Sequence, residues 1–421
     1  MSNMAMSSVI NLHNVLVRNT LLLTVMQASQ YVLALATMPY LARVLGVEQF
    51  GLLGIAMNIF ASVTLFTDWG FSLSAVREVA RNGRDPKALR RIFWDTMAAK
   101  ALLAAISLAA IMIISVIIGF SSPLAWIVLA GGFQVVGNGF CTSWFLRGLE
   151  IMGPMVAAEL IGRLSYLPLI FLCVHGPSDT MRAVLIGGIC NIIISIAAFR
   201  ICIRTTSLMP IAYTWSGAWR QLQDGWHIFL SVGAIALYTQ INVIMLGAVA
   251  GPVQAGLLFS AEKLKRASKT LSGPLTSAIY PRVNSLLMED PDRAVRLMKR
   301  LLVVQGAMSF GIFVVLLASA HFLIVIFFGP DFEDAVPAMR WLSGTIFLSG
   351  LGSVLGAQVM LPFGMKRAYM RILVVSGLFN VVAIVPFSYF FGATGASISI
   401  LLTEVIVTGA MGFVVWNLAQ E

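Results

Sequence analysis

Five ionisable side chains lie close together in a strongly apolar part of the chain, residues 254–287. Four of them recur at i, i+3, i+4 and i+7 and so share one helical face: Glu262, Lys265, Arg266 and Lys269. The fifth, Lys263, projects about 100° away from this face. Lining a water-filled cavity, the face would bind an anion beside one carboxylate. The alternatives are a structural network with other helices and a position in the outer headgroup layer.

Three other acidic residues stand in apolar segments. Glu159 pairs with Arg163 at i, i+4, a spacing that suits a staple between two helices or a substrate contact. Glu404 has no cation one turn away on its own segment, which suits proton coupling or a hydrogen-bonded packing role. Asp68 precedes a Trp-Gly pair and marks a broken helix or an interfacial helix end. Together with Glu262, these residues are the candidates for proton or sodium coupling.

An uncharged polar stripe runs along the first apolar segment. Its members recur at intervals of four, three and four residues: Thr20, Thr24, Gln27 and Tyr31. Such a stripe lines a cavity or hydrogen-bonds neighbouring helices. We expect it to line a cavity, because Arg18 lies near the inner end of the same surface.

The composition shows which elements must position these groups. Of the 421 residues, 59% are hydrophobic and only 11% are charged, against about 45–50% and about 25% in an average soluble domain. A cytosolic enzyme, a nucleic-acid-binding protein and a disordered chain are therefore excluded. The four cysteines have no metal-site spacing. We expect an all-α integral membrane protein with no catalytic residues, no metal and no cofactor.

Segments of about 20 apolar residues are needed to span a bilayer, and breaking the chain at charge clusters and turns predicts twelve spans. They are Val15–Tyr40, Phe50–Ala75, Ile92–Phe120, Leu124–Leu146, Ile151–Val174, Arg182–Ile203, Gly225–Val249, Gln254–Leu287, Leu301–Phe328, Met339–Met360, Tyr369–Phe391 and Ala396–Trp416. The outer loops between them are short and leave no room for a soluble catalytic domain.

Lys and Arg are distributed unevenly among the loops. With the N-terminus inside, nineteen of the 28 cations lie on the cytoplasmic side: Arg18, Arg77, Arg81, Arg84, Lys87, Arg90, Arg91, Arg147, Arg200, Arg204, Arg220, Arg282, Arg293, Arg296, Lys299, Arg300, Lys366, Arg367 and Arg371. Only Arg43, Arg182 and Arg340 lie outside. This asymmetry predicts that both termini face the cytoplasm. Lys100 lies near a span end, and we expect its side chain to reach the cytoplasmic headgroups.

A turn motif occurs twice. Gly46-Val47-Glu48-Gln49-Phe50-Gly51-Leu52-Leu53 returns 205 residues later as Gly251-Pro252-Val253-Gln254-Ala255-Gly256-Leu257-Leu258. Both turns join the first and second spans of a six-span block, which indicates a parallel repeat with a substrate site between two lobes. We predict an N-terminal lobe over 1–205, a cytoplasmic linker over 206–224 and a C-terminal lobe over 225–421.

Three segments resemble the Wzx-type O-antigen and exopolysaccharide flippases, a polysaccharide transporter family of the MOP superfamily. Trp144-Phe145-Leu146-Arg147-Gly148-Leu149-Glu150-Ile151-Met152 is similar to its W-F-x-x-G-x-E-x-M signature. Gly256–Leu264, with Pro274 and Tyr280-Pro281-Arg282, resembles its G-x-x-x-x-A-E-[KR] span and closing Y-P-R. Asp68–Ala75 resembles its D-x-G-F-x-x-x-A span. Arg147 departs from the uncharged residue of many members and is given no role.

The resemblance implies two six-helix lobes in a V, as in MATE exporters and the lipid II flippase MurJ, around a cationic cavity. It implies an inner-membrane flippase that moves an undecaprenyl-diphosphate-linked oligosaccharide to the periplasmic leaflet by alternating access. The family motif maps directly onto Glu262 and Lys263; the helical face adds Lys265, Arg266 and Lys269. We add the remaining candidate cavity residues Arg163, Arg18, Gln27 and Tyr31.

Partners and alternatives follow from the same residues. The expected partners are the lipid-linked glycan and membrane lipids, with polysaccharide polymerase machinery left open and nucleic acid excluded. One alternative is a MATE-like cation-coupled exporter of small molecules, which predicts an acidic cavity. Another is a membrane polysaccharide polymerase or ligase, which needs catalytic residues in a large outer loop.

Overall fold

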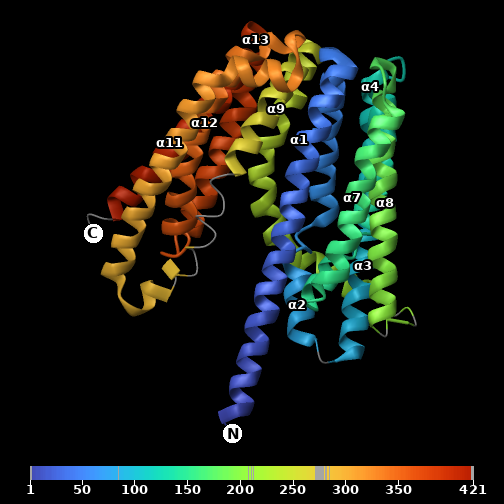
Figure 1. The fold of residues 1–421 in the computed structure, drawn as a ribbon, viewed down its shortest axis with the longest axis vertical. Helices are drawn as coiled ribbons and strands as arrows, with labels where there is room; N and C mark the ends of the chain where they lie inside the picture. Colours follow the sequence, from blue (N-terminus) through green and yellow to red (C-terminus); the bar gives the residue numbers. More distant parts are fainter. Residues whose placement is uncertain are drawn as a thin grey trace. The chain divides into compact units, whose positions relative to one another are not determined.

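The computed structural model is built from α-helices, with no strand in the part of the chain that it describes (Figure 1). It describes residues 2–418 except 84, 207, 210, 212, 271–278, 280–281 and 284. Within its helices the side chains of residues 2–17, 19–20, 23, 31, 231, 234, 237–238, 291 and 418 are not described. The predicted all-α membrane fold is confirmed.

The helices follow one another with short connections. The α-helices are α1 (Ser2–Asp68), α2 (Ser74–Asn82), α3 (Pro86–Ile118), α4 (Pro123–Ala130), α5 (Gly132–Gly139), α6 (Ser143–Gly148), α7 (Met152–Cys173), α8 (Thr180–Thr205), α9 (Trp215–Thr270), α11 (Pro291–Phe328), α12 (Val336–Ser353) and α13 (Lys366–Leu418). Two 3₁₀ turns, η1 (Pro177–Asp179) and η2 (Pro330–Ala335), and a π-helical segment, η3 (Val354–Met360), lie between them.

Local sequence signals set several helix boundaries. The side chains of Asp85 and Ser122 accept hydrogen bonds from backbone N–H groups at the starts of α3 and α4, each of which begins with proline. Gly119 and Gly329 end α3 and α11 at positive φ, where a side chain would be strained.

Nine helices in the described residues are long and apolar enough to cross a membrane. Three long helices, α1, α9 and α13, each contain one glycine outside helical geometry: Gly46, Gly251 and Gly392. Each of these helices covers two predicted spans. The nine helical segments are therefore compatible with twelve spans, and the chain is a multi-pass membrane protein.

The chain divides into two compact units. Unit 1 comprises residues 1–38 and 59–232, and unit 2 comprises residues 39–58 and 233–421. Since the helices α1 and α9 contribute to both units, the division falls inside these helices. The lobe and linker boundaries drawn from the sequence stay a prediction.

In unit 1 the segment that follows α8 is fastened to α2 and α3. Trp94 Nε1 donates to the carbonyl of Leu208 at 2.8 Å, and the buried carboxylate of Asp95 accepts from the backbone N–H of Thr214 at 2.7 Å. Further along, Gln221 Nε2 donates to Glu78 Oε2 at 2.6 Å. The first turns of α9 are therefore part of unit 1.

The fourth predicted span is broken into the helices α4, α5 and α6. Between α5 and α6, Lys100 Nζ donates to the carbonyl of Cys141 at 3.2 Å. Lys100 is only 3% exposed, so the expectation that it reaches the headgroups is wrong. Its side chain satisfies a carbonyl freed by the helix break, which matters because a bilayer offers no water partner.

In unit 2 the two repeated turns pack against each other. Gly46 and Gly251 share the same unusual backbone conformation, with φ of 74° and 86°. A Cβ at Gly51 would clash with the carbonyl of Pro252, and one at Gly256 would clash with the carbonyl of Val47. The close backbone approach explains the paired glycines and supports the internal repeat.

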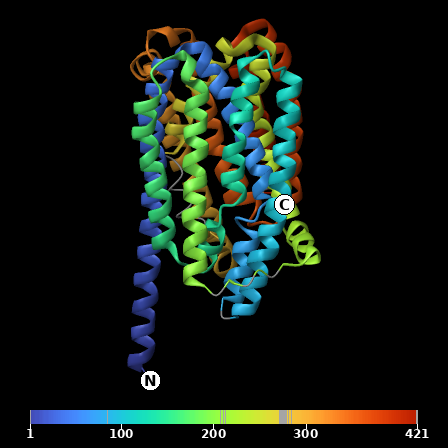
Figure 2. The ribbon, with the colours of Figure 1, turned by 90° about the vertical axis from the view of Figure 1, so that its right-hand side faces the viewer.

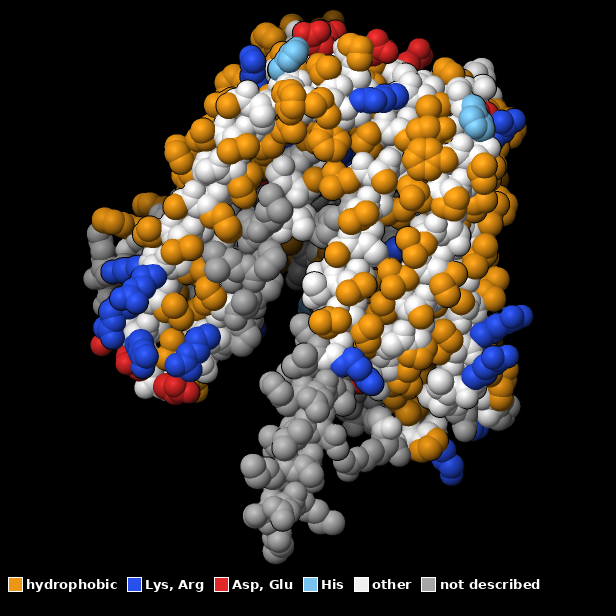
Figure 3. Space-filling model, in the orientation of Figure 1, with side chains coloured by type: hydrophobic (Ala, Val, Ile, Leu, Met, Phe, Trp, Pro, Cys, Tyr) orange, Lys and Arg blue, Asp and Glu red, His pale blue; other side chains and the backbone are white. Residues whose placement is uncertain are grey.

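The helix α11 shows how charge is distributed along unit 2. Its first turns carry Arg293, Arg296, Lys299 and Arg300, and Figure 3 shows basic side chains gathered where α11 begins, with hydrophobic side chains along its length. At its other end, η2 contains three acidic residues: Asp331, Glu333 and Asp334. Which side of the membrane each end faces stays a prediction from the distribution of Lys and Arg.

Candidate functional site

The charged face predicted for the eighth span lies in unit 2 on α9, after the bend at Gly251. Glu262 is its centre, with a side chain that is 3% exposed. Its Oε2 lies 3.3 Å from Arg266 Nη2 and its Oε1 lies 4.0 Å from Lys265 Nζ. The predicted i, i+3 and i+4 contacts are thus formed by one buried carboxylate.

The cations of this face differ in their access to solvent. The Lys265 side chain is 17% exposed and that of Arg266 is 49% exposed, while Lys269 is also exposed. Arg266 Nη2 donates to the carbonyl of Thr239, on the preceding part of α9, at 3.3 Å. Arg266 and Lys269 are therefore the cations that can meet a ligand without first being uncovered.

Lys263 lies about 100° around the helix from the other four charges and contacts an aromatic ring. Its Nζ lies 4.5 Å from the ring centroid of Phe259, one turn earlier. A cation–π contact of this kind satisfies part of the ammonium charge in a water-poor environment. Phe259 in turn packs on Phe50, with ring centroids 5.2 Å apart.

Glu404, on α13, lies within electrostatic range of Lys265 and Lys269. The sequence left this carboxyl without a cation one turn away, and its charged neighbours instead come from α9. Two coupling candidates, Glu262 and Glu404, therefore share Lys265 as a charged neighbour.

Arg163 and Glu159 form the predicted pair in unit 1, on α7, at 2.9 Å. Arg163 Nη1 also donates to the carbonyl of Met26 on α1 at 3.4 Å. The amide of Gln30, with its oxygen toward the guanidinium, accepts from Nη1 and Nη2 at 2.5 and 2.6 Å. These contacts favour the staple between two helices over a free substrate contact.

Gln30, a hydrogen-bond partner of Arg163, is not a member of the polar stripe predicted on the first apolar segment. Of the predicted stripe, Gln27 is exposed on α1, and so is Arg18, while the side chain of Tyr31 lies outside the described residues. Met26 and Gln30 lie one turn apart and therefore on the same face of α1. This spacing is the signal in the sequence that both could contact one side chain on a neighbouring helix.

Asp68 ends α1 at a helix break, as the broken-helix interpretation predicts. Trp69 and Gly70 both have positive φ, 48° and 84°. The Asp68 carboxylate accepts from the hydroxyl of Ser72 at 2.8 Å. Trp69 stacks on Phe229 with centroids 4.3 Å apart, which holds a conformation that costs a non-glycine residue about 1–3 kcal/mol.

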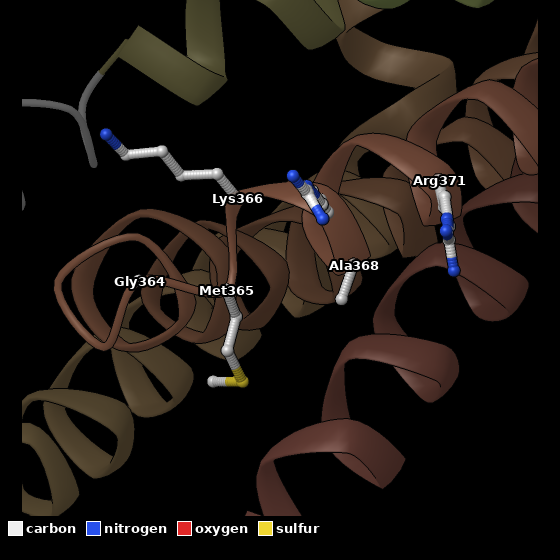
Figure 4. A pocket seen from close by; sticks show the side chains of 6 residues that line it. Gly364, Met365, Lys366, Ala368 and Arg371 are labelled. Atoms are coloured by element: carbon white, nitrogen blue, oxygen red, sulfur yellow. The ribbon is translucent and has the colours of Figure 1, made fainter.

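A second basic region surrounds the first turns of α13. A cavity of about 720 Å³ there is lined by Gly364, Met365, Lys366, Arg367, Ala368 and Arg371. Figure 4 shows the side chains of Lys366 and Arg371 extending away from one another. Because these cations diverge, we assign them to the topology signal rather than to a binding site.

Ionisable residues held inside membrane-spanning helices mark a candidate functional site. Residues 16–287 match the model of the family described as "Polysaccharide biosynthesis protein". The chain belongs to this family.

Two curated relatives cover nearly the whole chain. A protein of Escherichia coli (strain K12) named "Putative O-antigen transporter" is 32% identical over 400 residues, which are 95% of this chain and 96% of that protein. A protein of the same name from Shigella dysenteriae is 26% identical over 398 residues, 93% of this chain and 97% of that protein.

Solved structures show the same fold. An inward-facing multidrug resistance MATE family transporter of the MOP superfamily matches with a TM-score of 0.76 and 14% identity, over 93% of this chain and 94% of that one. The lipid II flippase MurJ, in an inward closed conformation, matches with a TM-score of 0.72 and 14% identity, over 94% and 87%. The chain therefore shares the fold of these two proteins.

Proposed function

We propose that the chain is an inner-membrane flippase for an undecaprenyl-diphosphate-linked oligosaccharide, the repeat unit of an O-antigen or exopolysaccharide. The family and the names of the two relatives support a polysaccharide-related cargo. The lipid carrier, the direction toward the periplasmic leaflet and alternating access are the finer parts of the proposal.

The main support for an anionic cargo is the excess of basic over acidic residues in the charged face of α9. Four cations, Lys263, Lys265, Arg266 and Lys269, share residues 262–269 of α9 with a single carboxylate, Glu262, which pairs with Lys265 and Arg266. A charge in the middle of a membrane costs roughly 2.5–3.5 kcal/mol, so an excess of cations there favours an anionic cargo. A diphosphate fits, because Arg and Lys are its natural counter-ions where the dielectric constant is low.

The contacts suggest different roles for the buried and the exposed residues of this face. Glu262 is the most buried member and holds Lys265 and Arg266 in place. Arg266 and Lys269, the exposed cations, would contact the diphosphate. We keep Lys263, Arg163, Arg18, Gln27 and Tyr31 as cavity candidates, with Arg163 already occupied by partners in unit 1.

The energy source is the open part of the proposal. Glu262 and Glu404 share Lys265 as a charged neighbour, so protonating either carboxyl would raise the positive charge of the face and strengthen its hold on an anion. Glu159 and Asp68 stay alternatives. A moving cationic face would also feel the membrane potential, about 2.3 kcal/mol per charge for every 100 mV.

The fold alone does not separate this function from that of a drug exporter, since the MATE transporter and MurJ match about equally well. The charges do. A cation-coupled exporter of cationic drugs needs acidic groups at its site, whereas α9 presents four basic groups to one acid. A polymerase or ligase is disfavoured by the named transporters among the relatives.

An export assay tests the proposal. In a strain that depends on this chain for its surface glycan, the double variant Arg266→Ala/Lys269→Ala should lose surface glycan and accumulate the lipid-linked precursor. The matched control Arg293→Ala/Lys299→Ala removes two cations from the first turns of α11 and should export normally. Normal export by the first variant, at equal membrane abundance, would contradict the proposal.

A further inference from the structure

An apolar groove of about 580 Å³ runs along α8 in unit 1. Figure 2 shows α8 between α7 on one side and the helices α4 and α5 on the other. The lining residues come from one face of α8 and the last turn of α5: Ile192, Ser195, Ile196, Phe199, Arg200, Ile203, Val136, Gly137 and Phe140. All but Ser195 and Arg200 are apolar or glycine.

The break in the fourth span shapes this groove. At Gly137 the two helices touch, since a Cβ there would lie 2.9 Å from the Cβ of Asn191, and Ser195 donates to the Gly137 carbonyl at 2.6 Å. Two residues later α5 ends, and Phe140 is 48% exposed. The wall formed by α5 therefore stops, while the apolar face of α8 continues past it.

The length of the groove matches half a bilayer. From Ile192 to Ile203 an α-helix rises about 16 Å, and half of a hydrocarbon core is about 15 Å. Arg200 lies at the end of the groove nearest the C-terminus of α8, with Arg204 one turn beyond. By the predicted orientation this is the cytoplasmic end.

Arg200 is exposed and forms no ion pair with an acidic residue in the part of the chain that the structure describes. Its long side chain can place the guanidinium at the depth of the lipid phosphates while its stem stays among apolar atoms. The groove thus ends beside a cation that has no acidic partner among the described residues, and the predicted orientation puts this end at the cytoplasmic headgroups.

We propose that this groove binds an anionic phospholipid of the cytoplasmic leaflet, with one acyl chain along α8 and its phosphate on Arg200. Basic pockets between membrane helices on the cytoplasmic side hold anionic headgroups in this way. A phospholipid fits better than the undecaprenyl carrier, because the groove is one leaflet long and the carrier chain is much longer when extended. The site is separate from the charged face of α9, so it does not depend on the proposed cargo.

Native mass spectrometry of the purified full-length protein tests the site. The protein is titrated with dioleoylphosphatidylglycerol, with dioleoylphosphatidylethanolamine and, separately, with undecaprenyl phosphate. We expect the wild type to retain phosphatidylglycerol about five-fold more strongly than phosphatidylethanolamine, the ratio that about 1 kcal/mol per cation near a headgroup gives.

Two variants test the two halves of the site. Arg200→Gln should remove the headgroup preference, and Ile196→Trp should fill the groove and lower the binding of both phospholipids. Arg81→Gln, which removes an exposed cation of α2 far along the chain from the groove, should bind like the wild type.

Three results would overturn the proposal. Equal losses in Arg200→Gln and Arg81→Gln would mean a general attraction between basic protein and acidic lipid. Unchanged binding in both groove variants would mean that the lipid lies elsewhere. Displacement of phosphatidylglycerol from Arg200 by equimolar undecaprenyl phosphate would assign the groove to the carrier lipid instead.

Discussion

Removing the negative charge of Glu262 tests whether this carboxylate holds the charged face of α9 together. In Glu262→Gln the amide oxygen can still accept from Arg266, so the variant loses charge rather than shape. Lys265, whose side chain is 17% exposed, then loses its ion pair with Glu262 inside the membrane and, among the described residues, keeps only Glu404 as an acidic neighbour.

The expected size of the effect follows from these contacts. Breaking a buried ion pair by removing one partner costs about 3–5 kcal/mol. Here the cost is reduced because Arg266 is half exposed and because Glu404 lies near Lys265. We therefore expect the free energy of unfolding to fall by about 2–3 kcal/mol.

Thermal unfolding in detergent, followed by the circular dichroism of the helices, measures this change. The matched control is Glu333→Gln, which breaks the exposed contact with His321 and should cost less than about 1 kcal/mol. The double variant Glu262→Gln/Lys265→Gln should recover most of the lost stability, because neither charge is then left alone. Wild-type stability in Glu262→Gln, or no recovery in the double variant, would refute the reasoning.

Three other substitutions have defined expectations. Gly217→Ala places a Cβ against the buried carboxylate of Asp95 and should lower the melting temperature. The control Gly233→Ala has open space around the new Cβ and should raise the free energy of unfolding by about 0.5–1 kcal/mol. Equal effects of the two substitutions would contradict the docking of α9 in unit 1. Arg163→Lys loses the contact of both guanidinium nitrogens with Gln30, so its free energy of unfolding should be about 1–2 kcal/mol lower. An unchanged melting temperature would argue against a role of Arg163 in joining α7 to α1. If Glu404 carries the coupled proton, glycan export in Glu404→Gln should no longer respond to external pH, and a wild-type pH response would exclude that role.

Much of the fold could be predicted from the sequence, because spans and their caps depend on local composition. The Gly46 and Gly251 turns were visible as a repeated motif, and both adopt the same positive-φ bend. The i, i+4 partners of Glu262 and Glu159 also follow from helix geometry alone. These features involve residues that are near one another in the chain.

What the sequence missed depends on contacts between distant residues. Lys100 was expected at the headgroups, but a carbonyl freed by the break after α5, 41 residues away, binds it inside the protein. Asp95 holds Thr214 over 119 residues, and Glu404 meets its cations from another helix. No apolar pattern along one segment reports such partners.

Direct binding of the lipid diphosphate tests the central claim most sharply. The purified protein in nanodiscs is titrated with undecaprenyl diphosphate, undecaprenyl monophosphate and undecaprenol. We predict tightest binding of the diphosphate, weaker binding of the monophosphate, and a loss of at least ten-fold for the diphosphate in Arg266→Ala/Lys269→Ala, equivalent to about 1.4 kcal/mol. Equal affinity for all three lipids, or undiminished diphosphate binding by the double variant, would contradict a cationic cargo site on α9.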